Sequence, residues 1–277
     1  LGTGGALLSG TGAKAAGMGE VCADCHEIAP FEKTFHGRAW TGMGQQHTCQ
    51  SCHGTTDQHV NDPSKQTVIS FSDDGGRTAE ELNEQCLGCH VSSTNLSFWD
   101  KGMHSRNDVA CVSCHDIHAA RSDVDQLTVC FTCHRSVRGD INKRSRHPIE
   151  EGKVKCNDCH NPHGTEATHN MIRASHVNQL CYQCHPDKRG PYVYEHPPVE
   201  ENCATCHAPH GSRHNKLMTE KIPNLCQDCH DWSRHPGTPY DAETGFVGSG
   251  PSNRFFARSC LNCHGAIHGS TNFEHHA

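Results

Sequence analysis

The stretch from His196 to His210 contains two cysteines spaced to share one ligand. Cys203 and Cys206 are separated by two residues, and His207 follows directly. With this spacing, two thiols can each add to a vinyl group of one haem while the next residue offers its imidazole to the iron. The stretch therefore has the form of a c-type haem attachment site.

The same Cys-x-x-Cys-His pattern occurs ten times and uses all 20 cysteines. A disulfide framework and zinc sites are the two other chemistries that paired cysteines serve. Neither needs a histidine after every pair, and with 26 histidines in 277 residues the chance of ten such histidines is about 10⁻¹⁰. The sequence therefore predicts ten covalently attached haem c groups. The predicted attachment residues are Cys22, Cys25, Cys49, Cys52, Cys86, Cys89, Cys111, Cys114, Cys130, Cys133, Cys156, Cys159, Cys181, Cys184, Cys203, Cys206, Cys226, Cys229, Cys260 and Cys263. The predicted proximal iron ligands are His26, His53, His90, His115, His134, His160, His185, His207, His230 and His264.

Sixteen further histidines compete for the second axial position of these haems. Three lie in His-x-x-His modules and one in a close variant, three precede proline, which holds them outside a helix, and others stand alone in polar surroundings. His59 is preferred to His47, which lies only two residues before Cys49. The predicted distal ligands are His36, His59, His104, His118, His147, His163, His196, His210, His235 and His268. None of the five methionines recurs with the repeat, so we expect bis-histidine haems of low potential.

Peptide geometry keeps His210 on the same side of the porphyrin as His207, three residues before it. We therefore expect His210 to serve a neighbouring haem, so that one short peptide ties several haems together.

Composition limits what else the chain can be. Only 34% of the residues are hydrophobic, below the usual apolar share of about 45–50%, so stacked porphyrins are expected to form the core. A net charge of -7 makes nucleic acid an unsuitable partner. No apolar run reaches the roughly 20 residues of a membrane-spanning helix. The one basic cluster is either a solvated loop or a partner for haem propionates; it comprises Arg135, Arg138, Lys143, Arg144 and Arg146.

A two-haem module is repeated three times in the middle of the chain. Its first cysteines are Cys111, Cys156 and Cys203, and each module is followed by a plainer motif. We predict a multihaem cytochrome c fold that is elongated and mostly irregular, with short α-helices and little β-structure. The predicted organisation is a flexible arm over 1–20 and one elongated decahaem domain over 21–277, with possible pentahaem halves 21–135 and 136–277.

Few regular elements are expected. Thr78-x-x-Glu81 has the form of a capping box and predicts a helix that runs through His90. Similar short helices should run into Cys130, Cys181 and Cys226. Residues 67–71 have the alternation of a short strand, and 54–85 and 231–259 are expected to be surface loops.

Longer motifs accompany the ten attachment sites: Asn-Pro-His-Gly at 161–164, Lys-Arg-Gly-Pro at 188–191, Glu-His-x-Pro at 195–198, Ala-Pro-His-Gly at 208–211 and Ser-Cys-Leu-Asn-Cys-His at 259–264. With these motifs the chain, from about residue 20 to its end, resembles the periplasmic decahaem cytochromes of outer-membrane porin-cytochrome conduits, the MtrA, DmsE and PioA type. Members of this type place a histidine at each of the ten predicted distal positions.

The resemblance implies an electron wire without catalytic residues. Its implied partners are an outer-membrane β-barrel porin, periplasmic electron-donor or electron-acceptor cytochromes, and an outer-surface multihaem cytochrome or reductase. The implied location is the periplasm, inside the porin. The Gly/Ala-rich start at Leu1 fits the expectation of a mature exported chain.

Two alternatives stay open. One is a free or filament-forming multihaem electron carrier. The other is a multihaem reductase, which is disfavoured because substrate reduction needs an open axial position and all ten motifs end in histidine.

Overall fold

The computed structural model describes residues 22–27, 29–42, 49–64, 66–72, 75–119, 125–167, 170–230, 240–241, 243, 245–246, 260–262 and 264–272. These residues belong to two compact units. The first lies within 1–97 and 104–125, and the second within 98–103 and 126–277. The first unit holds the first four attachment motifs, and the second holds the other six.

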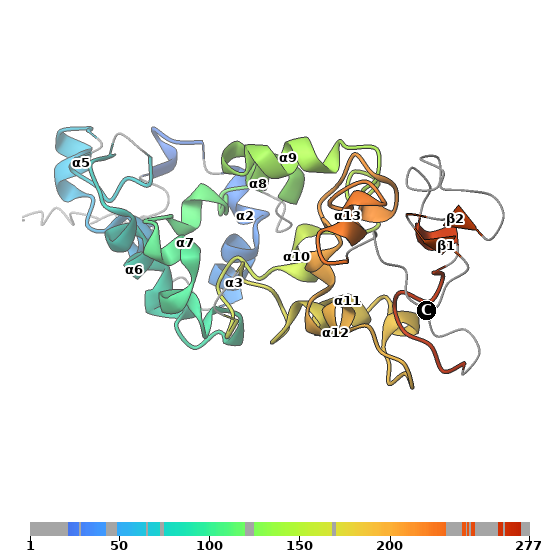
Figure 1. Ribbon diagram of the computed structural model, residues 1–277. Helices are drawn as coiled ribbons and strands as arrows, with labels where there is room; N and C mark the ends of the chain where they lie inside the picture. Colours follow the sequence, from blue (N-terminus) through green and yellow to red (C-terminus); the bar gives the residue numbers. More distant parts are fainter. Residues whose placement is uncertain are drawn as a thin grey trace, which may run out of the picture. The chain divides into compact units, whose positions relative to one another are not determined.

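The regular elements are short (Figure 1). Those up to residue 119 are α2 (Ala29–Glu32), α3 (Phe35–Gly42), α4 (Gln50–His53), α5 (Asp57–Asn61), α6 (Ala79–His90), η2 (Thr94–Leu96), η3 (Trp99–Lys101), α7 (Met103–Arg106) and η4 (Cys111–Ser113). Those that follow are α8 (Gln126–Cys133), α9 (Arg135–Ile141), α10 (Cys156–Cys159), α11 (Val177–Tyr182), η5 (Pro186–Lys188), α12 (Pro197–Glu201), η6 (Cys203–Thr205), η7 (Asn215–Leu217), α13 (Asn224–Gln227), β1 (Tyr240–Asp241), β2 (Gly245–Phe246) and η8 (Cys260–Asn262). The prediction of short helices, much irregular chain and little β-structure is confirmed.

Helix α6 begins as its sequence predicts. The Glu81 amide donates to Thr78 Oγ1 at 3.2 Å, and the Thr78 amide donates to Glu81 Oε2 at 2.8 Å, which completes a capping box. The box satisfies two amides that have no partner within the helix. The predicted helices into Cys130, Cys181 and Cys226 are also present, as α8, α11 and α13.

Two local predictions are wrong. Residues 67–71 form no strand: residues 66–69 make a turn, in which the Thr67 hydroxyl donates to the Ser64 carbonyl at 2.8 Å and the Ile69 amide donates to the His53 carbonyl at 2.9 Å. Region 54–85 is only partly loop, because it contains α5 and the start of α6, and region 231–259 contains the antiparallel pair β1–β2. Of the basic cluster, Arg135 and Arg138 lie in α9.

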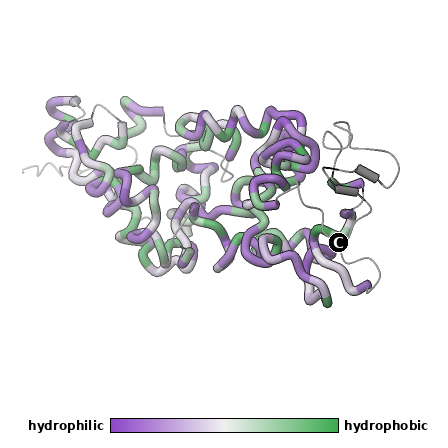
Figure 2. The backbone as a smooth tube through the Cα atoms, in the orientation of Figure 1, coloured by the Kyte–Doolittle hydropathy of each residue, from purple (hydrophilic) through white to green (hydrophobic). Residues whose placement is uncertain are grey.

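Conventional apolar packing is sparse in the described part of the chain. Its buried hydrophobic residues are Leu82, Trp99, Ala110 and Ile141. Figure 2 shows hydrophobic positions scattered in short stretches among hydrophilic ones. So small an apolar core cannot offset the conformational entropy lost on ordering the chain. Among the described residues, no helix has the length and apolar character needed to span a membrane.

Candidate functional site

Each described attachment motif closes into one helical turn. In the His196–His210 segment, the His207 amide donates to the Cys203 carbonyl at 3.0 Å. The same bond, at 2.8–3.0 Å, joins the histidine to the first cysteine in the motifs that begin at Cys22, Cys49, Cys111, Cys130, Cys156, Cys181, Cys226 and Cys260. The turn places two cysteines and one imidazole on the same side of the backbone, as attachment of a single haem requires. Cys263 and His235 lie outside the described residues.

The two competing chemistries find no counterpart within the described ranges. No disulfide joins the 19 described cysteines. No group of three or more histidine, cysteine or carboxylate side chains is arranged there to hold a metal ion.

Seven motif histidines each face one of the predicted distal histidines. Their ring centroids are 6.0–6.3 Å apart. The pairs are His26–His59, His90–His36, His53–His118, His185–His147, His160–His210, His230–His196 and His207–His268.

This spacing fits a metal held between two imidazoles. A metal–imidazole bond is about 2.0–2.1 Å long and the ring centroid lies about 1.1 Å behind the nitrogen, so two rings on opposite faces of one iron have centroids about 6.3 Å apart. Direct ring contacts cover a wider range of centroid separations, about 4.5–7 Å, so it is the recurrence of one narrow range at seven pairs of motif and distal histidines that matches an iron between the rings. The seven pairs therefore leave room for one iron each.

Hydrogen bonds set the tautomer of five of these histidines. Their Nδ1 atoms lie 2.7–3.0 Å from backbone carbonyl oxygens. A carbonyl can only accept, so Nδ1 carries the proton and Nε2 keeps its lone pair for a metal. The pairs are His53 with Ile69, His59 with Ser64, His147 with Pro209, His160 with Asn170 and His207 with Lys216.

Burial favours the ligating form of several predicted ligands. It lowers the pKa of His53, His210 and His268 below the ordinary histidine value, and nearby histidines lower these pKa values further. Burial acts in the same direction on the pKa of His36 and His115. A neutral imidazole is the form that binds iron.

Glycines allow the distal histidines of two repeats to reach their places. A Cβ atom added to Gly211, which follows His210, would collide with the Asp140 carbonyl oxygen. Gly164, which follows His163, would collide with the Phe98 carbonyl oxygen and has a φ of +104°. Only glycine permits both approaches.

Successive motifs meet through their first cysteines. A side-chain interaction between Cys86 and Cys111 lowers the pKa of Cys111 to about 7 and raises that of Cys86. Side-chain interactions of the same kind join Cys22 with Cys49, Cys130 with Cys156, Cys181 with Cys203, and Cys226 with Cys260.

Other successive motifs approach each other through their second cysteines. Cys52 lies near Cys89, Cys159 near Cys184, and Cys206 near Cys229, close enough for each neighbour to raise the thiol pKa beyond the increase that burial causes. Within each unit, the motifs are therefore ordered in space as they are in sequence, with first-cysteine and second-cysteine approaches in turn.

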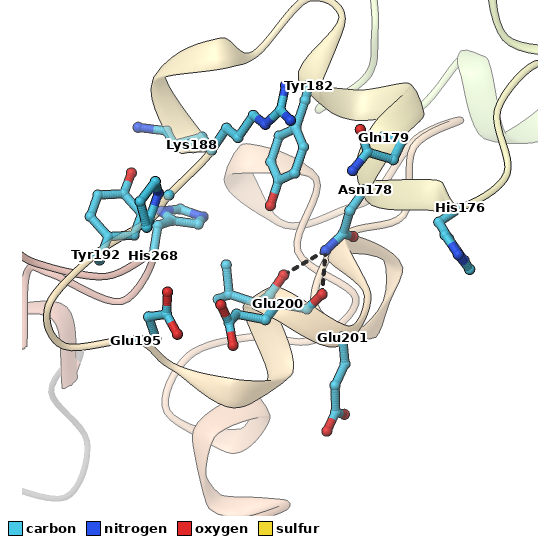
Figure 3. A pocket seen from close by; sticks show the side chains of 14 residues that line it. His176, Asn178, Gln179, Tyr182, Lys188, Tyr192, Glu195, Glu200, Glu201 and His268 are labelled. Carbon is cyan, nitrogen blue, oxygen red and sulfur yellow. Dashed lines mark hydrogen bonds between the residues drawn. The ribbon is translucent and has the colours of Figure 1, made fainter.

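A cavity of about 500 Å³ adjoins His268, one member of the His207–His268 imidazole pair (Figure 3). Its walls include Asn178, Tyr182, Tyr192 and the predicted distal ligand His268. Since His268 faces His207, the cavity adjoins the imidazole pair that contains the proximal histidine of the Cys203 motif.

Some groups that position the predicted ligands have no recognisable sequence pattern. The carbonyls that fix histidine tautomers have no signature, because any residue type supplies one. Asn83 and Asn178, described further below, share a spacing that could have been noticed, since each lies three residues before the first cysteine of a motif.

Comparisons with known proteins agree with this geometry. A family model described as a doubled CXXCH motif matches residues 147–190 and 196–235, and a cytochrome c-type protein NrfB-like model matches 49–128. The chain is 41% identical over 227 residues to the multiheme cytochrome MtrA of Shewanella baltica, covering 80% of this chain and 67% of that protein. It is 28% identical over 132 residues to the cytochrome c-type protein NrfB of Escherichia coli, covering 44% of this chain and 68% of that protein. The chain therefore belongs to the MtrA family of multihaem c-type cytochromes, which hold haem covalently at Cys-x-x-Cys-His motifs and transfer electrons.

Proposed function

We propose that the chain is a decahaem electron wire. The observation that carries this proposal is the coincidence of seven imidazole pairs at 6.0–6.3 Å with motifs that approach one another in sequence order. Haem held at each motif would supply one-electron redox chemistry at its iron.

The protein's own residues hold and insulate this series. Paired cysteines anchor each porphyrin edge, and the motif turn directs one imidazole at the iron. The Nδ1–H bonds to carbonyls keep the imidazoles oriented and strengthen them as donors. Two histidine ligands per haem would leave substrate no open coordination site. This arrangement favours a carrier over a reductase, and we assign no catalytic residues.

Three further assignments complete the proposed ligand set. In the first unit, we assign His104 to His115, since both lie in that unit. In the second unit, we assign His163 to His134 and His235 to His264. His235 is chosen because it lies between the motifs that begin at Cys226 and Cys260 and precedes a proline. All ten haems would then be bis-histidine.

We further propose that the wire operates through an outer-membrane β-barrel. It would exchange electrons with periplasmic cytochromes at one end and with an outer-surface multihaem cytochrome or reductase at the other. Membership of the MtrA family and the conduit-type motifs support this assignment. A mean hydropathy of -0.70 would make direct contact with lipid unfavourable, and a barrel would supply the protein sheath.

The test uses proteoliposomes that enclose an electron-accepting dye. Vesicles with the barrel and this protein together should pass electrons from an external reductant to the dye, and vesicles with either one alone should not. Conduction without the barrel, or none with it, would reject the barrel assignment. Concentration-dependent assembly with electron transfer between copies would favour the filament-forming carrier instead.

A further inference from the structure

Two buried asparagines occupy equivalent places in the two units. Asn83 lies in α6 and Asn178 in α11, and their exposed fractions are 7% and 6%. Each stands three residues before the first cysteine of an attachment motif. Buried amide side chains need hydrogen-bond partners, so the contacts of these two residues indicate what they do.

Both asparagines bond to the beginning of the next motif. Asn83 Oδ1 accepts from the Cys111 amide at 2.7 Å, and its Nδ2 donates to the Val109 carbonyl at 3.2 Å. Asn178 Oδ1 accepts from the Cys203 amide, also at 2.7 Å. Asn178 Nδ2 donates to the carbonyls of residues 199 and 200, both at 2.8 Å (Figure 3).

The backbone amides that donate to the two asparagines have no other acceptor in their own helices. Cys111 and Cys203 are the first residues of η4 and η6, where an amide has no acceptor within its own helix. The missing acceptor comes from the helix of the preceding motif, 28 residues earlier for Cys111 and 25 residues earlier for Cys203. Each asparagine therefore caps one motif with a side chain from another.

The cysteine whose amide bonds to the asparagine is also the cysteine that lies close to the first cysteine of the preceding motif. The side chain of Cys86 lies close to that of Cys111, and the side chain of Cys181 lies close to that of Cys203. Because the asparagine lies one helical turn before Cys86 or Cys181, its bond fixes the backbone separation of the two cysteines that carry adjoining porphyrin edges.

We propose that Asn83 and Asn178 are positioning residues that fix the geometry, and hence the electronic coupling, of the third-fourth and seventh-eighth haem pairs. This inference rests on the proposed function only in that the cysteines of both motifs carry haem. Asparagine suits the role because a single short side chain supplies both an acceptor and donors. Alanine would leave a buried amide and buried carbonyls without partners, and aspartate would keep the acceptor but lose the donors.

Other first-cysteine pairs show weaker or different arrangements. At the Cys130–Cys156 pair, Gln126 Oε1 accepts from the Asn157 amide at 3.1 Å, in an exposed position. At the Cys226–Cys260 pair, the residue three before the first cysteine is Pro223, whose side chain has no amide. Among the described residues, a buried asparagine that accepts from the first-cysteine amide of the next motif is found at the Cys86–Cys111 and Cys181–Cys203 pairs. Its role can therefore be tested by mutation at these two pairs.

The experiment compares full-length haem-loaded variants by Soret circular dichroism, whose two-signed signal reports coupling between neighbouring porphyrins. We expect Asn83→Ala and Asn178→Ala each to keep ten haems and to lose about one eighth of the signal amplitude, one of the eight motif approaches described above, with the double variant losing about one quarter because sites in separate units add. Asn142→Ala is the matched control, since its amide bonds only to the Arg138 carbonyl within the same turn. It should leave the signal unchanged.

Haem content separates the possible outcomes. If an alanine variant carries fewer than ten haems, the leucine variant at that position decides, because leucine keeps the side-chain volume but has neither acceptor nor donors, and a wild-type signal in a fully loaded leucine variant overturns the proposal. Fully loaded alanine variants with the wild-type signal overturn it directly. A wild-type protein with fewer than ten haems or no porphyrin coupling would instead count against the proposed function.

Discussion

The imidazole of His210 lies opposite that of His160, with ring centroids 6.0 Å apart, although His210 is only three residues from His207. His207 itself faces His268 at 6.2 Å. In the proposed ligand set, one short peptide would therefore serve two different sites, with the proximal imidazole at one and the distal imidazole at another. This sharing links the integrity of neighbouring haems.

Replacement of His210 by methionine should affect the haem attached at Cys156 and Cys159. Methionine raises haem potential relative to histidine, so one haem should shift upward within the range of about 0.8 V that axial ligands span. The haem attached at Cys203 should keep its potential. Spectroelectrochemistry with peptide mapping of the attached haems measures both, and a shift confined to the Cys203 haem would contradict the pairing.

Replacement of Gly211 by alanine should displace His210 without touching a ligand atom. The new methyl group would collide with the Asp140 carbonyl oxygen, and such overpacking costs about 1–3 kcal/mol. We expect a high-spin fraction from one haem in the electronic spectrum. Gly139→Ala is the control, because an added Cβ there meets nothing within 4 Å; an equal spectrum for both variants would show that the approach of Gly211 to Asp140 does not position the ligand.

Removal of His268 should open one axial position beside the cavity. In His268→Ala, the iron bound to His207 should lose its second ligand, and the vacant position adjoins about 500 Å³ of space. A high-spin signal equivalent to one haem should appear and should disappear when free imidazole is added. His214→Ala, at a histidine outside the predicted ligand set, should leave the protein low-spin, and retention of the low-spin spectrum by His268→Ala would refute the assignment.

The capping box of α6 should make a local, pH-dependent contribution. Its hydrogen bonds with Thr78 lower the pKa of Glu81 below the ordinary value. A lowered folded-state pKa gives stability that is present above the unfolded-state value, about 4.3 for glutamate, and is lost as the pH falls through the folded-state value. The protection of the α6 amides against hydrogen exchange, taken relative to the intrinsic rate at each pH, should decrease in wild type as the pH falls through that window, and Glu81→Gln should flatten the dependence.

The hydroxyl of Thr78 supplies the other half of the box. Thr78→Ala should destabilise α6 by about 1 kcal/mol because the Glu81 amide loses its acceptor. Thr78→Ser keeps the hydroxyl and should exchange like wild type. The same slow exchange in all three proteins would mean that the haems, not the cap, hold this helix.

Removal of haem should unfold most of the chain. The four buried hydrophobic side chains of the described residues are too few to stabilise it alone. Replacing all 20 cysteines with alanine prevents covalent attachment, and far-ultraviolet circular dichroism of that variant should show little helix. A cooperative thermal transition in the cysteine-free chain would contradict a haem-dependent core.

Local chemistry was determined by the sequence alone. Cys203, Cys206 and His207 are joined by one helical turn, so their spacing predicts haem attachment whatever surrounds them. The capping box at Thr78 and Glu81 was predictable for the same reason, since both of its bonds span three residues. The strand expected over 67–71 failed because a strand needs a partner, and no local pattern reveals whether one is present.

Only the tertiary structure decided how distant residues combine. His147 faces His185, and His210 faces His160, across 38 and 50 residues of chain respectively. Each histidine alone has the same chemistry as any other. Composition and spacing therefore predicted which histidines could be distal ligands, but not which motif histidine each one faces. The order of motifs and the bond from Asn178 to Cys203 likewise depend on the packing of separate turns. The physical reason is that ligand identity is a property of single residues, whereas an iron site and the coupling between neighbouring sites require atoms from several segments to be placed within about 0.5 Å.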